Sequence, residues 1–84
     1  DGLRTQVGEI TFPIIKENLT DVLTCTEEQM ISAMKLVWER MKIVIEPSCA
    51  VPLAALLANP APFKGKRVGI ILTGGNVDLS QLPF

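Results

Sequence analysis

The chain contains no histidine and only two cysteines in its 84 residues. Without histidine these residues lack the commonest general base and metal ligand, which excludes a Ser-His-Asp triad and zinc chemistry within them. Cys25 and Cys49 stand in apolar sequence context. Two such cysteines do not suit a disulfide framework, and they favour reduced, buried thiols in a cytoplasmic protein.

The chain also lacks an excess of charge and a long hydrophobic run. Its net charge is −1, and because nucleic acids and anionic membranes both require a basic patch, we expect neither as a partner. We recognise no signal peptide, and the longest apolar runs fall far short of a membrane span. Apolar residues nevertheless make up 48% of the chain, which favours an oligomer or a part of something larger. The Asp-Gly start without Met also suggests that something precedes it.

The most regular pattern predicts an amphipathic helix from Thr26 to about Ile43. Thr26 and Gln29 have the spacing of a capping box, which satisfies two backbone N–H groups at a helix start. Apolar residues then recur at helical spacing on one face. They are Met30, Ala33, Met34, Val37, Trp38 and Met41. We interpret the tryptophan and the methionines as core or dimer-interface packing rather than as a cofactor site.

Two further helices are predicted on either side of this one. Thr11 is expected to cap a short helix over residues 12–18, after a loop over residues 1–10. Residues 49–58 are apolar nearly all round, so we expect a deeply buried helix with Pro52 near its first turn.

A β-branched run over residues 67–72 ends abruptly at Thr73, Gly74 and Gly75. The run does not alternate, which is typical of a strand covered on both faces, and residues 21–25 are a second β-prone run. In open α/β sheets, ligands bind at the rim where such strands end. Paired glycines permit positive φ and let a cofactor approach the backbone. The sequence therefore predicts an α/β protein with a ligand site at this turn.

Several motifs occur along the chain in a recognisable order. They are Asp1-Gly-Leu-Arg, Phe12-Pro-Ile-Ile, Asp21-Val, Thr26-Glu-Glu, Trp38-Glu-Arg-Met-Lys, Glu46-Pro-Ser and Gly69-Ile-Ile-Leu-Thr-Gly-Gly-Asn-Val-Asp-Leu. Together they resemble the fold-type II pyridoxal-phosphate (PLP) enzymes, in the branch of serine racemase and the serine/threonine dehydratases. The motifs at Trp38 and Glu46 are more similar to serine racemase than to biosynthetic threonine dehydratase, and they argue against a cysteine synthase relative.

The resemblance implies that residues 1–84 are a single, incomplete unit, the C-terminal segment of the large PLP-binding domain, with helices packed on a mostly parallel sheet. In that family the Schiff-base lysine, the glycine-rich phosphate loop and the acidic metal site lie upstream of such a segment. No lysine of this chain stands in the family's lysine motif. We therefore expect no catalytic residue here, and a segment that is inactive alone.

For the whole enzyme, the resemblance implies removal of the α-proton of L-serine or L-threonine. Racemisation or β-elimination to a 2-oxo acid and ammonia would follow. It also implies a homodimer and a divalent cation, Mg²⁺ or Ca²⁺, with ligands outside this chain. The alternative is a catalytically inactive fragment or an α/β interaction module that lacks the Schiff-base lysine.

By the resemblance, Thr73 stands where the family places a Ser or Thr hydroxyl against the pyridine nitrogen of PLP. A neutral hydroxyl cannot keep that nitrogen protonated as a carboxylate would, so the ring is a milder electron sink, which suits racemisation and β-elimination. The alternative is a hydroxyl bonded to the local turn backbone. The methyl group that Thr adds to the commoner Ser could lower activity.

Three glycines and one acid match other cofactor positions of the family. Gly74 and Gly75 would make room for the ring, or are ordinary turn glycines. Glu46 matches a carboxylate close to the cofactor, or is an acid that interacts with a helix dipole. Gly2 matches a glycine whose backbone lies near the ring, or is a loop glycine.

Lys42 and Asn76 match positions that, in serine racemase, contact an allosteric nucleotide at a subunit interface. The alternatives are a solvated helix lysine and a turn asparagine tied to its own backbone. Cys49 stands where the family has a small Gly or Ala. Its thiol is either inert and buried or lies at a helix start, where its pKa would be lowered.

Overall fold

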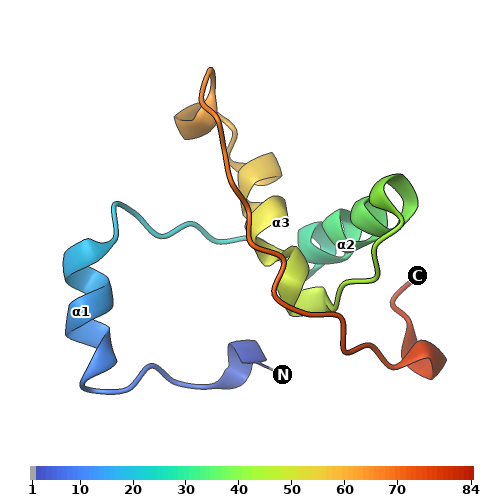
Figure 1. The fold of residues 1–84 in the computed structure, drawn as a ribbon, viewed down its shortest axis with the longest axis horizontal. Helices are drawn as coiled ribbons and strands as arrows, with labels where there is room; N and C mark the ends of the chain where they lie inside the picture. The colour runs from blue at the N-terminus through green and yellow to red at the C-terminus, as the bar shows by residue number, and fades with distance from the viewer. Residues whose placement is uncertain (1) are drawn as a thin grey trace.

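The computed structural model describes residues 2–84, so Asp1, which begins the predicted loop and the first motif, lies outside the described residues. Three α-helices follow in order, and Figure 1 shows their arrangement: α1 (Thr11–Asn18), α2 (Glu27–Met41) and α3 (Val51–Ala58). The short 3-10 helices are η1 (Gly2–Arg4), η2 (Pro47–Ala50), η3 (Ala61–Phe63) and η4 (Leu79–Gln81). In this described part of the chain, no helix is both long and apolar enough to cross a membrane.

Helix α2 begins where the capping box predicts. The Thr26 hydroxyl accepts a hydrogen bond from the Gln29 backbone N–H at 3.1 Å, and the Gln29 side chain accepts one from the Thr26 N–H at 2.9 Å. Glu27 and Glu28 occupy the first turn, where the helix dipole favours negative charge. The helix ends slightly earlier than predicted, because Lys42 adopts the left-handed conformation with φ of 59°.

The hydrophobic core lies between α2, η2 and α3. Its buried side chains come from the predicted stripe of α2 and from the residues that follow this helix. They are Ala33, Met34, Val37, Ile45, Cys49, Ala50 and Ala54. The stripe is buried only in its middle, because Met30 and Trp38 are half-buried and Met41 is exposed. Core packing is therefore confirmed at the centre of the stripe, and Met41 takes no part in this core.

The helix predicted over residues 49–58 is divided in two. Its beginning belongs to the 3-10 helix η2, and the α-helix itself starts only at Val51. Pro52 lies in the first turn of α3, where its missing N–H costs no intrahelical hydrogen bond.

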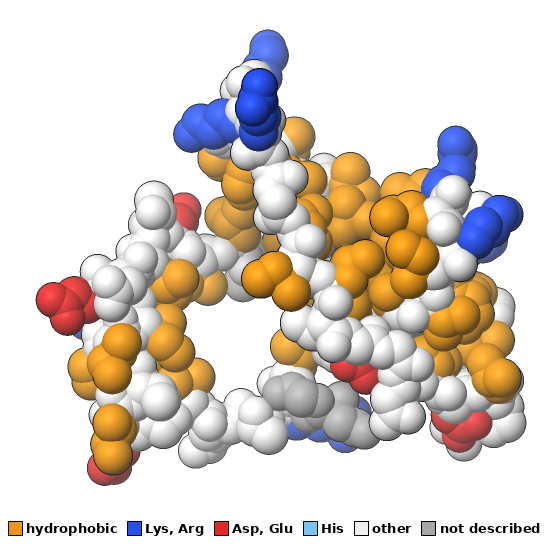
Figure 2. All heavy atoms as spheres, in the orientation of Figure 1, with side chains coloured by type: hydrophobic (Ala, Val, Ile, Leu, Met, Phe, Trp, Pro, Cys, Tyr) orange, Lys and Arg blue, Asp and Glu red, His pale blue; other side chains and the backbone are white. Residues whose placement is uncertain are grey.

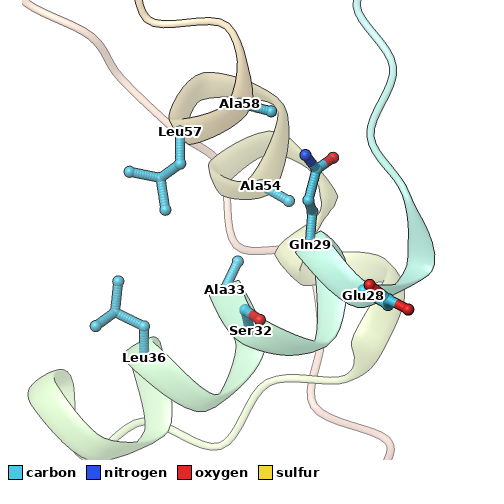
Figure 3. A pocket seen from close by; sticks show the side chains of 8 residues that line it. All are labelled: Glu28, Gln29, Ser32, Ala33, Leu36, Ala54, Leu57 and Ala58. Atoms are coloured by element: carbon cyan, nitrogen blue, oxygen red, sulfur yellow. The ribbon is translucent and has the colours of Figure 1, made fainter.

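Small side chains let α2 and α3 approach each other. Ala33 and Ala54 are both buried, and Figure 3 shows them where the two helices lie nearest. Leu36 and Leu57 lie beside a more open gap, and Leu57 is 56% exposed. The prediction of an all-round buried helix is thus wrong, because α2 covers only one side of α3. The gap is a cavity of about 540 Å³ lined by Glu28, Gln29, Ser32, Ala33, Leu36, Ala54, Leu57 and Ala58.

Helix α1 stands apart from this core. None of its residues is buried, and Figure 2 shows an opening between this N-terminal arm and the remaining helices. Thr11 is the first residue of the helix rather than its cap, which is a correction to the prediction. Its hydroxyl donates a hydrogen bond to the Gly8 carbonyl at 3.3 Å, and Ile10 occupies the cap position with no side-chain acceptor.

Residues 67–72, predicted to be a buried strand, run as an unpaired segment (Figure 1). No strand occurs anywhere in residues 2–84, and residues 21–25 form none either. The side chain of Ile71 is 78% exposed. The mostly parallel sheet is therefore not confirmed. A strand needs a neighbour to pair its N–H and C=O groups, and the described part of the chain supplies no such neighbour.

The chain exposes more surface than a compact protein of its mass. Its accessible surface is 6980 Å², whereas a compact monomer of the same mass would expose about 4,900 Å². Its radius of gyration is 14.1 Å, against about 12 Å for a compact chain of this length. The surplus of about 2,000 Å² is more than twice the roughly 800 Å² that one partner buries in a standard protein–protein interface.

Candidate functional site

The turn after α2 holds Glu46 in a fixed place. Lys42 reverses the chain direction through its left-handed backbone. The indole N–H of Trp38 then donates a hydrogen bond to the Ile45 carbonyl at 2.9 Å, and the side chain of Ile45 is buried in the core. Both restraints act on the residue directly before Glu46, so the backbone of Glu46 starts from a fixed position.

The turn after α2 meets the end of the unpaired segment through two hydrogen bonds. The Glu46 N–H donates to the Gly74 carbonyl at 3.0 Å. The Thr73 N–H donates to Cys49 Sγ at 3.1 Å. We call Glu46, Cys49, Thr73, Gly74 and Gly75 the junction. The structure thus brings together four of the residues that the sequence assigns to a cofactor, from two distant parts of the chain.

Gly75 lies so close to the backbone of Val44 that no side chain fits. A Cβ atom on Gly75 would lie 2.6 Å from the Val44 carbonyl oxygen. A Cβ atom on Gly74 would lie 3.0 Å from Glu46 Oε1, which belongs to a flexible side chain that can move. Neither glycine uses the positive φ that its lack of a side chain permits. What requires glycine at 75 is a close approach of the protein's own backbone.

Thr73 carries a free hydroxyl at the junction. The residue is exposed, and its backbone N–H is bonded to Cys49 Sγ. Its hydroxyl has no hydrogen-bond partner within residues 2–84. The alternative prediction, a hydrogen bond to the local turn backbone, is therefore wrong. A hydroxyl can both donate and accept, and this one is therefore available to a ligand.

A polar cavity of about 360 Å³ adjoins the junction, lined by Glu46, Pro47, Ser48, Asn76, Val77, Asp78, Gln81 and Pro83. Asp78 accepts hydrogen bonds from the Ser80 hydroxyl at 2.6 Å and from the Ser80 backbone N–H at 2.9 Å. These bonds, the side-chain one foremost, hold the pKa of Asp78 below its usual range. Asn76 is exposed at this cavity, and none of the described hydrogen bonds ties its side chain to its own backbone.

Besides Asn76, two more of the predicted site residues lie outside the junction. Lys42 is the exposed C-cap of α2, where its N–H donates to the Trp38 carbonyl at 3.2 Å. Gly2 belongs to η1, and its neighbour Leu3 lines a different cavity with the N-terminal end of α2. In residues 2–84, no three Cys, Asp or Glu side chains come together as a metal site would require.

Residues 1–74 match the protein family described as "Pyridoxal-phosphate dependent enzyme". The chain belongs to this family of PLP enzymes. The resemblance seen in the ordered motifs is thereby confirmed.

The chain is similar to several PLP enzymes. It is 48% identical, over its whole length, to 27% of the beta-hydroxyaspartate dehydratase of Paracoccus denitrificans. It is 60% identical, over 98% of its length, to 26% of the serine racemase of Dictyostelium discoideum. A crystal structure of the Dictyostelium discoideum serine racemase superposes on 94% of this chain, with a TM-score of 0.86 and 27% of that structure covered. A crystal structure of a T.th. threonine deaminase superposes on 96% of it, with a TM-score of 0.87, 43% identity and 26% of that structure covered.

The chain therefore spans about a quarter of the length of these relatives. Its fold is that of the corresponding segment of a fold-type II PLP enzyme, since both superpositions cover nearly all of it. At the junction, the unpartnered Thr73 hydroxyl stands directly before two residues without side chains. A hydroxyl that can donate a hydrogen bond fits the pyridine nitrogen of PLP, which is an acceptor.

The sequence did not predict three interactions at this site. The Cys49–Thr73 hydrogen bond joins residues that no local pattern connects, so no sequence signal could have found it. The helical spacing of Trp38 indicates packing and gives no sign of the hydrogen bond that its indole donates. The Asp78–Ser80 turn could have been found, because an aspartate two residues before a serine is a known capping pattern.

Proposed function

We propose that residues 1–84 are part of the cofactor-binding domain of a PLP enzyme that removes the α-proton of L-serine or L-threonine. The relatives are named serine racemase, threonine deaminase and beta-hydroxyaspartate dehydratase. Serine, threonine and hydroxyaspartate all carry a hydroxyl on the β-carbon. After loss of the α-proton, such a substrate either regains a proton on the opposite face, which inverts the α-carbon, or loses the β-hydroxyl as hydroxide, after which hydrolysis by water gives a 2-oxo acid and ammonia.

The free hydroxyl of Thr73 is the observation that carries this proposal. PLP, when bound, withdraws electrons from the α-carbon of an amino acid and so makes its proton more acidic. Thr73 Oγ1 would form a hydrogen bond with the pyridine nitrogen. Because the hydroxyl is neutral, it would not hold a proton on that nitrogen, and the electron withdrawal would stay moderate.

The other residues of the junction would shape the space around the ring. Gly74 and Gly75 would present an edge without side chains to it. Glycine at 75 would also keep that edge compatible with the nearby Val44 carbonyl, which a Cβ atom would approach to 2.6 Å. The Glu46 carboxylate lies beside Gly74 and would supply the polar surroundings of the cofactor.

Residues beyond the junction would contribute to cofactor binding, to regulation and to contacts with partners. Gly2 would approach the ring through its backbone. Asn76 and Lys42 would contact a regulatory nucleotide at a subunit interface, which the free amide of Asn76 and the exposed Lys42 support. The surplus surface of about 2,000 Å² supports both the remainder of the enzyme and a second subunit as partners. A divalent cation, Mg²⁺ or Ca²⁺, would take its ligands from outside these residues.

Visible absorption of the full-length protein tests the proposal. We expect a cofactor band once PLP is added, a change of that band with L-serine or L-threonine, and formation of the D-enantiomer or a 2-oxo acid. L-threo-3-hydroxyaspartate tests the substrate range in the same way. L-alanine, which lacks a β-hydroxyl, is the matched control and should yield no 2-oxo acid by elimination.

The same experiment distinguishes an enzyme from a catalytically inactive protein. A folded protein that acquires no cofactor band at any PLP concentration would contradict the proposal and support a catalytically inactive α/β interaction module. A band that no β-hydroxy amino acid alters would place the protein in the PLP family with another substrate class.

A further inference from the structure

Cys49 contributes more to the junction than its burial suggests. It lies in η2 with 1% of its surface exposed, so inert packing would be a sufficient reason for its presence. Its sulfur, however, also accepts the hydrogen bond from the Thr73 N–H at 3.1 Å. The core is thereby bonded directly to the residue whose hydroxyl is assigned to the cofactor.

Thr73 has little else to hold its backbone. The segment that leads to it has no partner strand in the described part of the chain. The next restraint is the hydrogen bond between the Glu46 N–H and the Gly74 carbonyl. The two bonds bracket the Cα atoms of Thr73 and Gly74, so together they fix the backbone direction at Thr73. That direction, together with the χ1 rotamer, sets where the Thr73 hydroxyl points.

We propose that Cys49 is a positioning residue for Thr73, whose sulfur holds the Thr73 backbone so that the hydroxyl faces the pyridine nitrogen of PLP. This proposal rests on the cofactor role proposed above for Thr73. Cys49 acts through that residue rather than by contact with the cofactor. The family resemblance implies an alanine or a glycine at this position. Neither residue has a side-chain acceptor for the Thr73 N–H.

Two substitutions separate the hydrogen bond from packing in the full-length holoenzyme. Cys49→Ala removes the acceptor, whereas Cys49→Ser keeps an acceptor in nearly the same place. We expect Cys49→Ala to speed hydrogen exchange at the Thr73 amide and to weaken PLP binding, each on the order of fivefold to tenfold. We expect Cys49→Ser to keep most of the wild-type protection at the Thr73 amide and most of the wild-type PLP affinity.

Cys25→Ala is the matched control, because it removes a half-buried thiol that also packs against the core. Exchange at Thr73 and PLP affinity should not change in this variant. Thr73→Val supplies the coupling test, since it removes the hydroxyl and keeps the backbone. In the Thr73→Val background, Cys49→Ala should still speed exchange at residue 73 but should no longer weaken PLP binding.

Three results would overturn the proposal, and each identifies what failed. Unchanged exchange at Thr73 in Cys49→Ala would show that the sulfur does not restrain the backbone. Equal losses of PLP affinity with and without the Thr73 hydroxyl would show that Cys49 acts through general packing. Wild-type PLP affinity in Thr73→Val alone would refute the cofactor role of Thr73, and the positioning role would fall with it.

Discussion

The rings of Trp38 and Phe84 meet edge to face, with their centroids 5.2 Å apart and their planes at 87°. This contact places the last residue of the chain against helix α2. The same indole donates its N–H to the Ile45 carbonyl, so one side chain links the end of the chain to the turn that carries Glu46.

Trp38→Phe is expected to destabilise the full-length protein by about 1–3 kcal/mol, because it leaves the Ile45 carbonyl without its hydrogen bond. Phe84→Leu is the matched comparison. It loses the ring contact, a loss of about 0.5–1.5 kcal/mol, and keeps the hydrogen bond. Urea unfolding of both variants checks the order, and a larger loss for Phe84→Leu would contradict it.

Gly75→Ala is expected to destabilise the protein by about 1–3 kcal/mol, since its Cβ would press on the Val44 carbonyl and a backbone shift would be needed. Gly74→Ala should cost less, because the Glu46 side chain can move aside. Gly69→Ala is the control, as a Cβ there meets nothing within 4 Å. Thermal unfolding that ranks Gly74→Ala as the most damaging of the three would refute this account of the junction.

Thr26→Ala is expected to cost about 1 kcal/mol, because it removes the side-chain half of the α2 capping box. Thr11→Ala should cost less than about 0.5 kcal/mol, since Thr11 is exposed and does not cap α1. Chemical denaturation of the two single variants measures the difference. Equal losses would mean that Thr11 has a capping role after all.

These helices show where local sequence suffices and where it does not. Thr26 and Gln29 satisfy each other within one turn of α2, so the sequence alone could predict its start. Whether Thr11 caps α1 depends on the backbone before it, which the sequence pattern does not fix. The apolar run at residues 67–72 predicts a covered strand, but its pairing depends on neighbours that residues 2–84 do not supply.

The junction, too, could be predicted from the sequence only in part. The turn at Thr73, Gly74 and Gly75 could be predicted as a site because its residues are adjacent in the sequence. The reason for glycine at 75 could not, because Val44 approaches it from a distant part of the chain. The hydrogen bond from the Thr73 N–H to Cys49 could not be predicted either, because the two residues are also distant in the sequence.

Asp78 makes the η4 turn sensitive to acid. Its pKa lies below the ordinary 3.8 because of the hydrogen bonds from Ser80. A lowered folded-state pKa gives stability that is fully present above the unfolded-state value and is lost as the pH falls through the folded-state value. In an NMR titration, we therefore expect the midpoint of the Ser80 amide shift to lie below pH 3.8. Ser80→Ala should raise the pKa of Asp78, and a pKa unchanged by this substitution would contradict the assignment.

The most direct test of the central claim is the protonation state of the cofactor's pyridine nitrogen, measured by ¹⁵N NMR of the full-length protein loaded with ¹⁵N-labelled PLP. The account predicts an unprotonated nitrogen in the wild type, because the neutral Thr73 hydroxyl cannot hold a proton there, and a protonated nitrogen in Thr73→Asp. A wild-type nitrogen that is already protonated, or one that does not respond to Thr73→Asp, would contradict the assignment of Thr73 to the cofactor ring.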